Sequence, residues 1–269
     1  MVKRKNVTRR AFLKNSAGAA VGILTAPYFI PATALGKGGA VAPGEKVTMA
    51  CIGVGWQGTS NMENFLREPD VEIVAVCDID DDHLQNAKTI VEENQGAGSV
   101  QTFHDFREVL ARDDIDTVSL GLPDHWHSIP AIMAAEAGKD IYAEKPLSHS
   151  LKEGREMCDA VRRYDRVWQT GSWQRSESHF RFAAGLVRNG RIGKVHTVEV
   201  GLPSGHTDFA GTKELTAFTN PPEELNYNFW LGPAPYAPYA PARVHKNWRW
   251  NYDYGGGQLM DWVGHHVDI

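Results

Sequence analysis

From residue 46 onward, continuous apolar runs alternate with segments of helical spacing. The run 47–54 is apolar almost throughout, as in a strand buried on both faces of a sheet. Such alternation predicts an α/β fold built on a parallel, doubly wound sheet. The expected strands are 47–54, 71–77, 116–122, 140–144 and 167–171, and the expected helices are 61–68, 80–93, 106–112, 129–137 and 151–164.

The pattern changes after residue 170. A helix is expected at 179–188 and a strand at 195–200, whereas residues 203–254 are rich in proline, glycine and aromatic residues and show no clear periodicity. The final segment reads as a helix that runs to the last residue without a stop signal. We therefore expect one domain over residues 46–170 and the N-terminal part of a second, truncated domain over residues 171–269.

Residues 1–34 have the layout of an export signal. All six charges before Ala34 are positive and include the pair Arg9-Arg10; an apolar stretch follows, and Ala32-Thr33-Ala34 fits a cleavage site. The alternatives are a basic amphipathic helix or a membrane anchor, but Pro27 and Pro31 make the apolar stretch too short to span a bilayer. We expect a twin-arginine signal peptide, recognition by the twin-arginine export machinery, a periplasmic or otherwise exported product, and a flexible arm at 35–45.

Composition narrows the range of partners. Without residues 1–34, 22 Lys and Arg remain against 33 Asp and Glu, a net charge of −11, which argues against nucleic acid as a partner. The three cysteines, Cys51, Cys77 and Cys158, are odd in number and lack the spacing of a disulfide framework. We expect a globular protein that is soluble after signal cleavage and needs no disulfide.

A glycine-rich turn follows the first predicted strand. Its sequence is Gly53-Val54-Gly55-Trp56-Gln57-Gly58, and Asp78 ends the second strand 20 residues later. In this context glycines let the backbone approach a pyrophosphate, and the acid meets the adenosine ribose. A plain tight turn and a helix cap are the alternatives. The spacing predicts dinucleotide binding, with NAD favoured over NADP because Asp78 would repel a 2′-phosphate.

Three further residues suggest proton and charge chemistry. Lys145 ends the fifth predicted strand, where the carboxyl edge of a parallel sheet faces the ligand crevice. Asp261 and His265 are four residues apart and share a helix face, and histidine suits a general base near neutral pH. A surface lysine, a helix cap and a structural histidine are the alternatives.

Four stretches occur in a recognisable order: GVGWQG with CDID, GLPDHWH, AEKP, and GGGQLMDWVGHHVDI. Together they resemble the Gfo/Idh/MocA oxidoreductase family. The resemblance implies an N-terminal Rossmann domain and a C-terminal α+β domain with an open, largely antiparallel sheet, the active site lying between them. It also implies that much of this second sheet is missing here, and that the full-length protein is a homo-oligomer.

The resemblance also implies residue roles. Lys145 would lie near the nicotinamide and orient the substrate hydroxyl, His265 would take its proton, and Asp261 would hold substrate or tune the pair. Val263 stands where many members have glycine, which leaves open whether His265 or His266 faces the cleft. The expected cofactor-binding residues are Gly53, Gly55, Trp56, Gln57, Gly58, Asp78, Leu122, Pro123, His127, Glu144 and Lys145.

The substrate side is expected to use polar and aromatic residues of the second domain. The candidates are Gln174, Arg175, Trp248 and Arg249, with core packing as the alternative for the tryptophan. His125 and His127 could pair on a metal, but no cysteine or acid cluster accompanies them, so no metal is expected. Many family members act on sugars or cyclitols, which makes such a molecule the expected substrate.

Three functions fit these residues. The first is a periplasmic sugar or cyclitol oxidoreductase with a tightly bound NAD, similar to glucose-fructose oxidoreductase-type members. The second is an NAD-dependent glycosidase or lyase that oxidises the sugar ring transiently. The third is a non-catalytic, nucleotide-loaded binding protein, against which the presence of both Lys145 and His265 argues.

Overall fold

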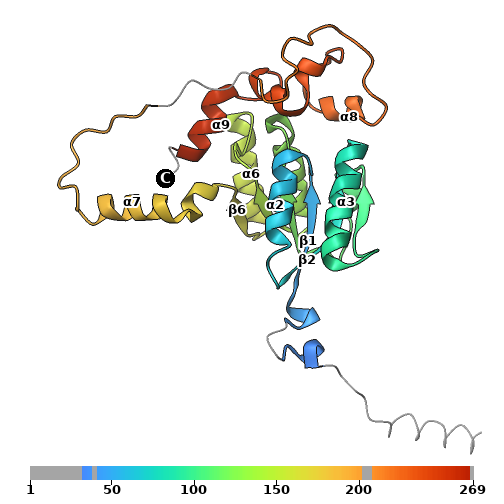
Figure 1. Ribbon diagram of the computed structural model, residues 1–269, viewed down its shortest axis with the longest axis horizontal. Helices are drawn as coiled ribbons and strands as arrows, with labels where there is room; N and C mark the ends of the chain where they lie inside the picture. The colour runs from blue at the N-terminus through green and yellow to red at the C-terminus, as the bar shows by residue number, and fades with distance from the viewer. Residues whose placement is uncertain (1–31, 38–40, 202–207, 267–269) are drawn as a thin grey trace, which may run out of the picture. The chain divides into compact units, whose positions relative to one another are not determined.

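The computed structural model describes residues 32–37, 41–201 and 208–266 (Figure 1). It divides into two compact units, residues 1–45 and 46–269. In the first, the described residues include two short 3-10 helices, η1 (Ala32–Leu35) and η2 (Pro43–Glu45). Most of the predicted signal peptide, residues 1–31, lies outside the described residues. The remaining description concerns the second unit.

Six strands form one sheet in the second unit. Every pair of neighbouring strands is parallel, and the order β3-β2-β1-β4-β5-β6 is that of a Rossmann fold, which confirms the predicted fold class. The order reverses between β1 and β4, which opens a crevice at their carboxyl ends. The strands are β1 (Val47–Ile52), β2 (Val71–Cys77), β3 (Gln101–Phe103), β4 (Thr117–Leu120), β5 (Asp140–Ala143) and β6 (Trp168–Thr170).

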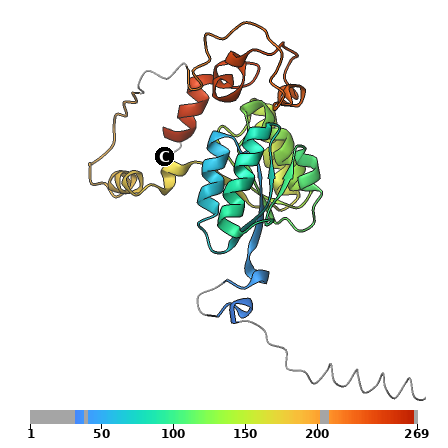
Figure 2. The same cartoon turned by 45° about the vertical axis from the view of Figure 1, so that its right-hand side comes forward.

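Helices cover both faces of this sheet. Met49 and Cys51 of β1 pack with α2 and α3, which lie side by side on one face, whereas Ala50 and Ile52 pack with α4, α5 and α6 on the other (Figure 2). Burial on both faces explains why the strands are apolar at successive positions. The helices are α2 (Trp56–Phe65), α3 (Asp81–Gln95), α4 (Phe106–Leu110), α5 (Ser128–Glu136) and α6 (Leu151–Arg163).

Polar side chains fix where several of these helices begin. The carboxylate of Asp80 accepts the backbone N–H of His83 and caps α3. Ser150 and Glu153 form a reciprocal capping box at the start of α6. Among the helices of the described ranges, none has both the length and the apolar character that a membrane crossing requires.

Residues after β6 form irregular structure around a third core. Leu225, Trp230, Trp248 and Tyr254 are buried together, and Ile79 of the Rossmann domain packs against them. The regular elements of this part are α7 (Ser178–Arg188), α8 (Tyr227–Leu231) and α9 (Gly257–His266), with short 3-10 helices η4 (Trp173–Ser176), η5 (Pro241–Arg243) and η6 (His245–Trp250); η3 (Asp124–Trp126) follows β4.

The structure corrects two predictions from the sequence and adds one strand. Residues 195–200 form no strand, and their valines are exposed, because no strand of the described residues lies alongside to complete the hydrogen bonds. Helix α2 begins at Trp56 rather than at residue 61, directly after the glycine turn. Strand β3, which alternates poorly, was not predicted. The antiparallel sheet of the second domain stays a prediction, since the described residues after Thr170 contain no strand.

Candidate active site

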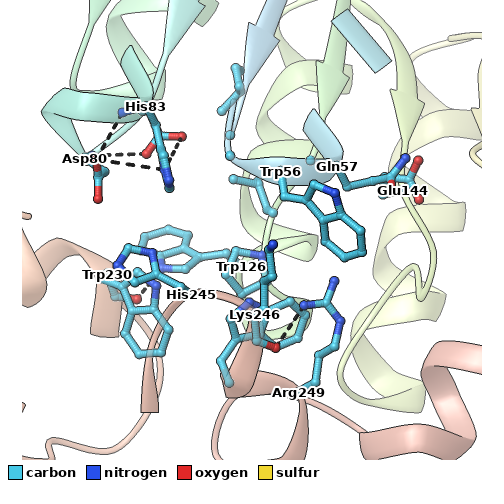
Figure 3. Close-up of a pocket in the computed structure, with 18 of the residues that line it drawn as sticks. Trp56, Gln57, Asp80, His83, Trp126, Glu144, Trp230, His245, Lys246 and Arg249 are labelled. Carbon is cyan, nitrogen blue, oxygen red and sulfur yellow. Dashed lines mark hydrogen bonds and ion pairs between the residues drawn. The ribbon is translucent and has the colours of Figure 1, made fainter. Parts of the chain in front are cut away.

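A cavity of about 470 Å³ lies at the carboxyl end of the sheet. Its wall includes the glycine turn together with Lys145, Asp261 and His265. Figure 3 shows side chains from both domains around it, with Trp56 and Gln57 from the start of α2 and Trp230 and Lys246 from the second domain. The predicted catalytic residues and most of the predicted cofactor-binding residues therefore line one cavity.

The glycine turn after β1 needs glycine at two positions. Gly53 has a φ of +79°, and a Cβ there would lie 2.6 Å from the carbonyl oxygen of Gly121. A Cβ on Gly58 would lie 1.8 Å from the carbonyl oxygen of Gly53. Gly55 precedes α2 without a side-chain cap and lines the cavity with Trp56. The first N–H groups of α2 thus remain available to an anion.

Asp78 connects the end of β2 to this turn. One carboxylate oxygen accepts the backbone N–H of Val54 at 2.8 Å, and the other accepts that of Asp80 at 3.0 Å. Nδ1 of His83 lies 3.8 Å from the same carboxylate, and this contact with Asp78 raises the pKa of His83. Asp78 therefore shapes the turn while still lining the cavity.

Lys145 and Asp261, which also line the cavity, form an ion pair. Lys145 follows β5, and its Nζ lies 2.5 Å from Oδ1 of Asp261 on α9. The Nε of Arg249 lies 3.7 Å from Oδ2 of the same carboxylate. A Cβ on Gly264 would lie 3.4 Å from the Lys145 side chain, an ordinary van der Waals distance, so α9 passes directly beside this lysine. Two cations thus share one carboxylate.

His265 lines the same cavity as Asp261. Its ring centroid lies 5.6 Å from that of Trp173 and 6.3 Å from that of Trp262. The shared helix face predicted from the spacing therefore brings Asp261 and His265 to one site. The side chain of His266 lies outside what the structure describes.

A chain of hydrogen bonds links α2 to the end of β5. Nε2 of Gln57 donates to Oδ1 of Asn61 at 3.0 Å, and Nδ2 of Asn61 donates to Oε1 of Glu144 at 2.8 Å. Burial raises the pKa of Glu144, and the Asn61 contact opposes that shift. Gln57 and Glu144 were predicted at the site, but Asn61 was not, because an asparagine inside a helix carries no sequence signal of its own.

Two residues predicted to bind cofactor lie behind the cavity wall instead. Leu122 and Pro123 line the cavity, but His127 is buried and its Nε2 lies 2.7 Å from the carbonyl oxygen of Leu122. Burial lowers the pKa of His127 to about 4, which favours a neutral structural imidazole. Gly58 is also buried, packed against Gly53. Both residues shape the wall rather than line it.

The predicted substrate residues divide between two cavities. Gln174, Trp248 and Arg249 line the cavity described above, together with Trp173. Gln174 is 2% exposed, and its Oε1 has no hydrogen-bond partner among the described residues. Arg175 instead lines a neighbouring cavity on another side of Lys145. Trp248 fits both the predicted substrate contact and the alternative of core packing, since it lines the cavity and also belongs to the core of the second domain.

Residues 224–254, here called the covering segment, were predicted at the site only through Trp248 and Arg249. Leu225 forms an antiparallel bridge with Asp80, and the backbone N–H of Asn226 donates to the carbonyl of Ile79 at 3.0 Å. Nε1 of Trp126 donates to the carbonyl oxygen of Trp230 at 2.8 Å. The covering segment is therefore hydrogen-bonded to the Rossmann domain beside the cavity that Trp230 helps to line.

Asp124 joins the loop after β4 to the turn before α9. Its Oδ2 accepts the backbone N–H of Gly256 at 3.0 Å, and its Oδ1 has no partner among the described residues. Burial raises the pKa of Asp124 to about 7. This carboxyl group supports the helix that carries Asp261 and His265.

Asp80, His83 and His245 bring possible ligand atoms within 4.8 Å of one another. Burial and the neighbouring His83 lower the pKa of His245, whereas the contact with Asp78 raises that of His83. The sequence did not suggest this group because His245 lies far along the chain, in the segment without periodicity.

Two family models match the chain. Residues 47–172 match an oxidoreductase family with an NAD-binding Rossmann fold, and residues 179–269 match the C-terminal alpha/beta domain of the same oxidoreductase family. The two matched ranges include the glycine turn and the Lys145 motif in the first, and Asp261 and His265 in the second.

Curated relatives match more than half of this chain. Glycosyl hydrolase family 109 protein 1 of Shewanella sp. (strain ANA-3) is 36% identical over 172 residues, which is 59% of this chain and 38% of the relative. An alpha-N-acetylgalactosaminidase of Shewanella oneidensis is 35% identical over the same shares. The match thus spans well under half the length of these relatives.

Solved structures share the fold. Myo-inositol 2-dehydrogenase from Lactobacillus plantarum is 27% identical with a TM-score of 0.51, over 56% of this chain and 43% of that one. Scyllo-inositol dehydrogenase from Lactobacillus casei, with NAD(H) and scyllo-inositol bound, is 23% identical with a TM-score of 0.50, over 55% and 42%. The second likeness shows the fold alone.

Proposed function

This chain belongs to the Gfo/Idh/MocA oxidoreductase family, with its NAD-binding Rossmann fold, and from that premise we propose that it oxidises a hydroxyl-bearing carbon of a sugar or cyclitol with bound NAD. One observation carries the proposal. The cavity that begins at the glycine turn also reaches Lys145, Asp261 and His265, so a dinucleotide and a hydroxyl group would meet among residues suited to move a proton.

The described residues fit a dinucleotide. Glycine is required at Gly53 and Gly58 for the turn and its packing, and Gly55 leaves the backbone open to the cavity. Asp78 stands where the adenosine ribose would lie, with Asp80 beside it, and these carboxylates favour NAD over NADP. When bound, the nicotinamide ring supplies the hydride acceptor.

The residues of this chain would handle the proton and the charge. We assign the proton of the substrate hydroxyl to His265, which lines the cavity beside Trp173. Lys145 would orient that hydroxyl and stabilise negative charge on its oxygen. Asp261 holds Lys145 in place at 2.5 Å and shares its other oxygen with Arg249.

The wall near this group suits a polyhydroxylated ring. The Oε1 of Gln174 can accept a hydroxyl hydrogen bond, since it has no partner among the described residues. Trp173 is 48% exposed and offers an aromatic face in the cavity. These contacts support a sugar or cyclitol substrate.

A second candidate function is glycosidic cleavage without net redox change. The Shewanella relatives, one named an alpha-N-acetylgalactosaminidase, favour it. Transient oxidation of a ring hydroxyl would acidify the adjacent C–H, and loss of that proton would expel the glycosidic oxygen. Water would then add to the resulting unsaturated ketone, and return of the hydride to the carbonyl would restore the sugar. The same three residues serve this reaction at its oxidation step.

Export completes the proposal. Residues 1–34 support a periplasmic location reached through the twin-arginine machinery, a route that carries folded proteins. A protein exported in this way can carry its NAD with it, and the cofactor would then be re-oxidised in place. Cell fractionation of wild type against Arg9→Lys/Arg10→Lys tests this step, and an unchanged periplasmic fraction would refute it.

Product analysis tests the two reactions. The purified protein is incubated with free sugars, cyclitols and aryl glycosides, and products are separated and weighed by mass spectrometry. An oxidoreductase yields a product two hydrogens lighter; a glycosidase yields free sugar and releases the aryl group with NAD unchanged. If His265→Ala matches wild type on every compound converted, the assignment of the site is wrong.

A further inference from the structure

We propose that Lys246, brought to the glycine turn by the covering segment, binds the pyrophosphate of the dinucleotide. The inference rests on the proposed function, because it assumes that NAD occupies the cavity. Rossmann domains hold this group with backbone N–H groups and a helix N-terminus. Here the second domain would add a full positive charge to that site.

The position of Lys246 carries the first step. Its side chain lines the cavity, and its Nζ lies 4.5 Å from the ring centroid of Trp56 (Figure 3). Trp56 is the first residue of α2, directly after Gly55. Lys246 thus makes a cation–π contact with Trp56 and stands beside the positive end of a helix, so an anion bound at the turn would meet two positive groups.

The other two cations that line the cavity differ from Lys246 in having a carboxylate partner. Lys145 and Arg249 both have Asp261 as carboxylate partner. Within the ranges the structure describes, Lys246 forms no ion pair with a carboxylate. The cation at the turn is thus available to a bound anion, while the cations at the substrate end already balance a carboxylate.

The position of Lys246 along the cavity indicates that it would bind the pyrophosphate and not a 2′-phosphate of the cofactor. A 2′-phosphate would lie near Asp78 and Asp80, where the carboxylates gather. Lys246 contacts Trp56 of the glycine turn instead, where the pyrophosphate of a Rossmann dinucleotide lies.

The covering segment holds Lys246 in this place. Its carbonyl oxygen accepts a hydrogen bond from Nη1 of Arg249 at 3.0 Å, and its neighbours Asn247 and Trp248 are buried. The bound cofactor would therefore join the Rossmann domain to the covering segment, and its release would require that the contact to Lys246 break.

Nucleotide binding tests the proposal without turnover. Dissociation constants for NAD, NADP, ADP and adenosine are measured by ligand-observed NMR on nucleotide-free wild type, Lys246→Met, Lys246→Arg and the control Lys213→Met. Lys213 is exposed and pairs with Glu214 outside the cavity. Melting curves of all four proteins check that each is folded.

We expect Lys246→Met to weaken ADP, NAD and NADP by roughly tenfold, the loss of one charge-assisted contact, and to leave adenosine unchanged. Lys246→Arg should recover most of that loss, and Lys213→Met should match wild type. Unchanged ADP affinity, an equal loss for adenosine, or a loss confined to NADP would overturn the proposal. If wild type binds none of these nucleotides, the proposed function itself fails and the inference falls with it.

Discussion

Replacing Asp124 with asparagine should change how the stability of the protein depends on pH. Burial raises the pKa of this carboxyl from 3.8 to about 7, so the folded state holds its proton more tightly than the unfolded chain does. Stability is therefore lost as pH rises from about 4 to about 7. One pKa step corresponds to about 1.4 kcal/mol, which gives an upper limit of about 4 kcal/mol for ionising Asp124 in the folded protein.

Asparagine has nearly the same shape, and its oxygen can still accept the N–H of Gly256, but it never ionises. Urea denaturation at a series of pH values from 4 to 9 would compare the free energies of unfolding of wild type and Asp124→Asn. We expect the difference to grow in favour of the variant by up to about 4 kcal/mol as pH rises, and then to level off.

The exposed residue Asp114 provides the control. Arg112 lowers the pKa of Asp114 below its usual 3.8, so the stability that this ionised carboxylate contributes is gained mostly below pH 4. Asp114→Asn should therefore be slightly less stable than wild type by a nearly constant amount between pH 4 and 9. A pH-independent difference for Asp124→Asn, or a growing difference in favour of wild type, would refute the reasoning about this buried carboxyl.

Three further predictions concern the turn, cofactor choice and chemistry. Gly58→Ala should lower the free energy of unfolding by about 1–3 kcal/mol, because its Cβ would meet backbone atoms. Gly185→Ala, whose Cβ would have nothing within 4 Å, should not lower it. Equal effects of the two substitutions in urea denaturation would contradict this reading of the packing. Asp78→Asn removes a charge and should raise NADP affinity relative to NAD about tenfold in competition binding; a constant ratio would exclude this role. Lys145→Ala and His265→Ala should each lower turnover at least about 100-fold in steady-state assays, and wild-type rates would remove them from the chemistry.

Much of the Rossmann domain could be predicted from local pattern. The second strand, residues 71–77, has the predicted bounds, because an apolar run ended by an acid is a local signal. The glycine turn and the Asp261–His265 spacing were equally local, and the structure brings both to one cavity. The start of α2 at Trp56 was missed because the helix begins with polar and small residues rather than with a periodic apolar pattern.

The rest depends on contacts between distant parts of the chain. The covering segment has no periodicity, and its place is set by partners such as Asp80 for Leu225 and Trp126 for Trp230. The burial of His127 likewise comes from the fold around the loop and not from the motif that contains it. At 195–200 a local strand pattern was present, but no strand formed, because no neighbouring strand among the described residues completes its hydrogen bonds.

The most direct test of the central claim is the near-ultraviolet absorbance of the purified, NAD-loaded protein during addition of sugars, cyclitols and glycosides. The account predicts that at least one of them produces the absorbance band of reduced nicotinamide, and that Lys145→Ala loaded with the same NAD produces none. If wild type holds NAD and no compound in the panel produces the band, or if Lys145→Ala produces it as fast as wild type, the proposed hydride transfer at this site is contradicted.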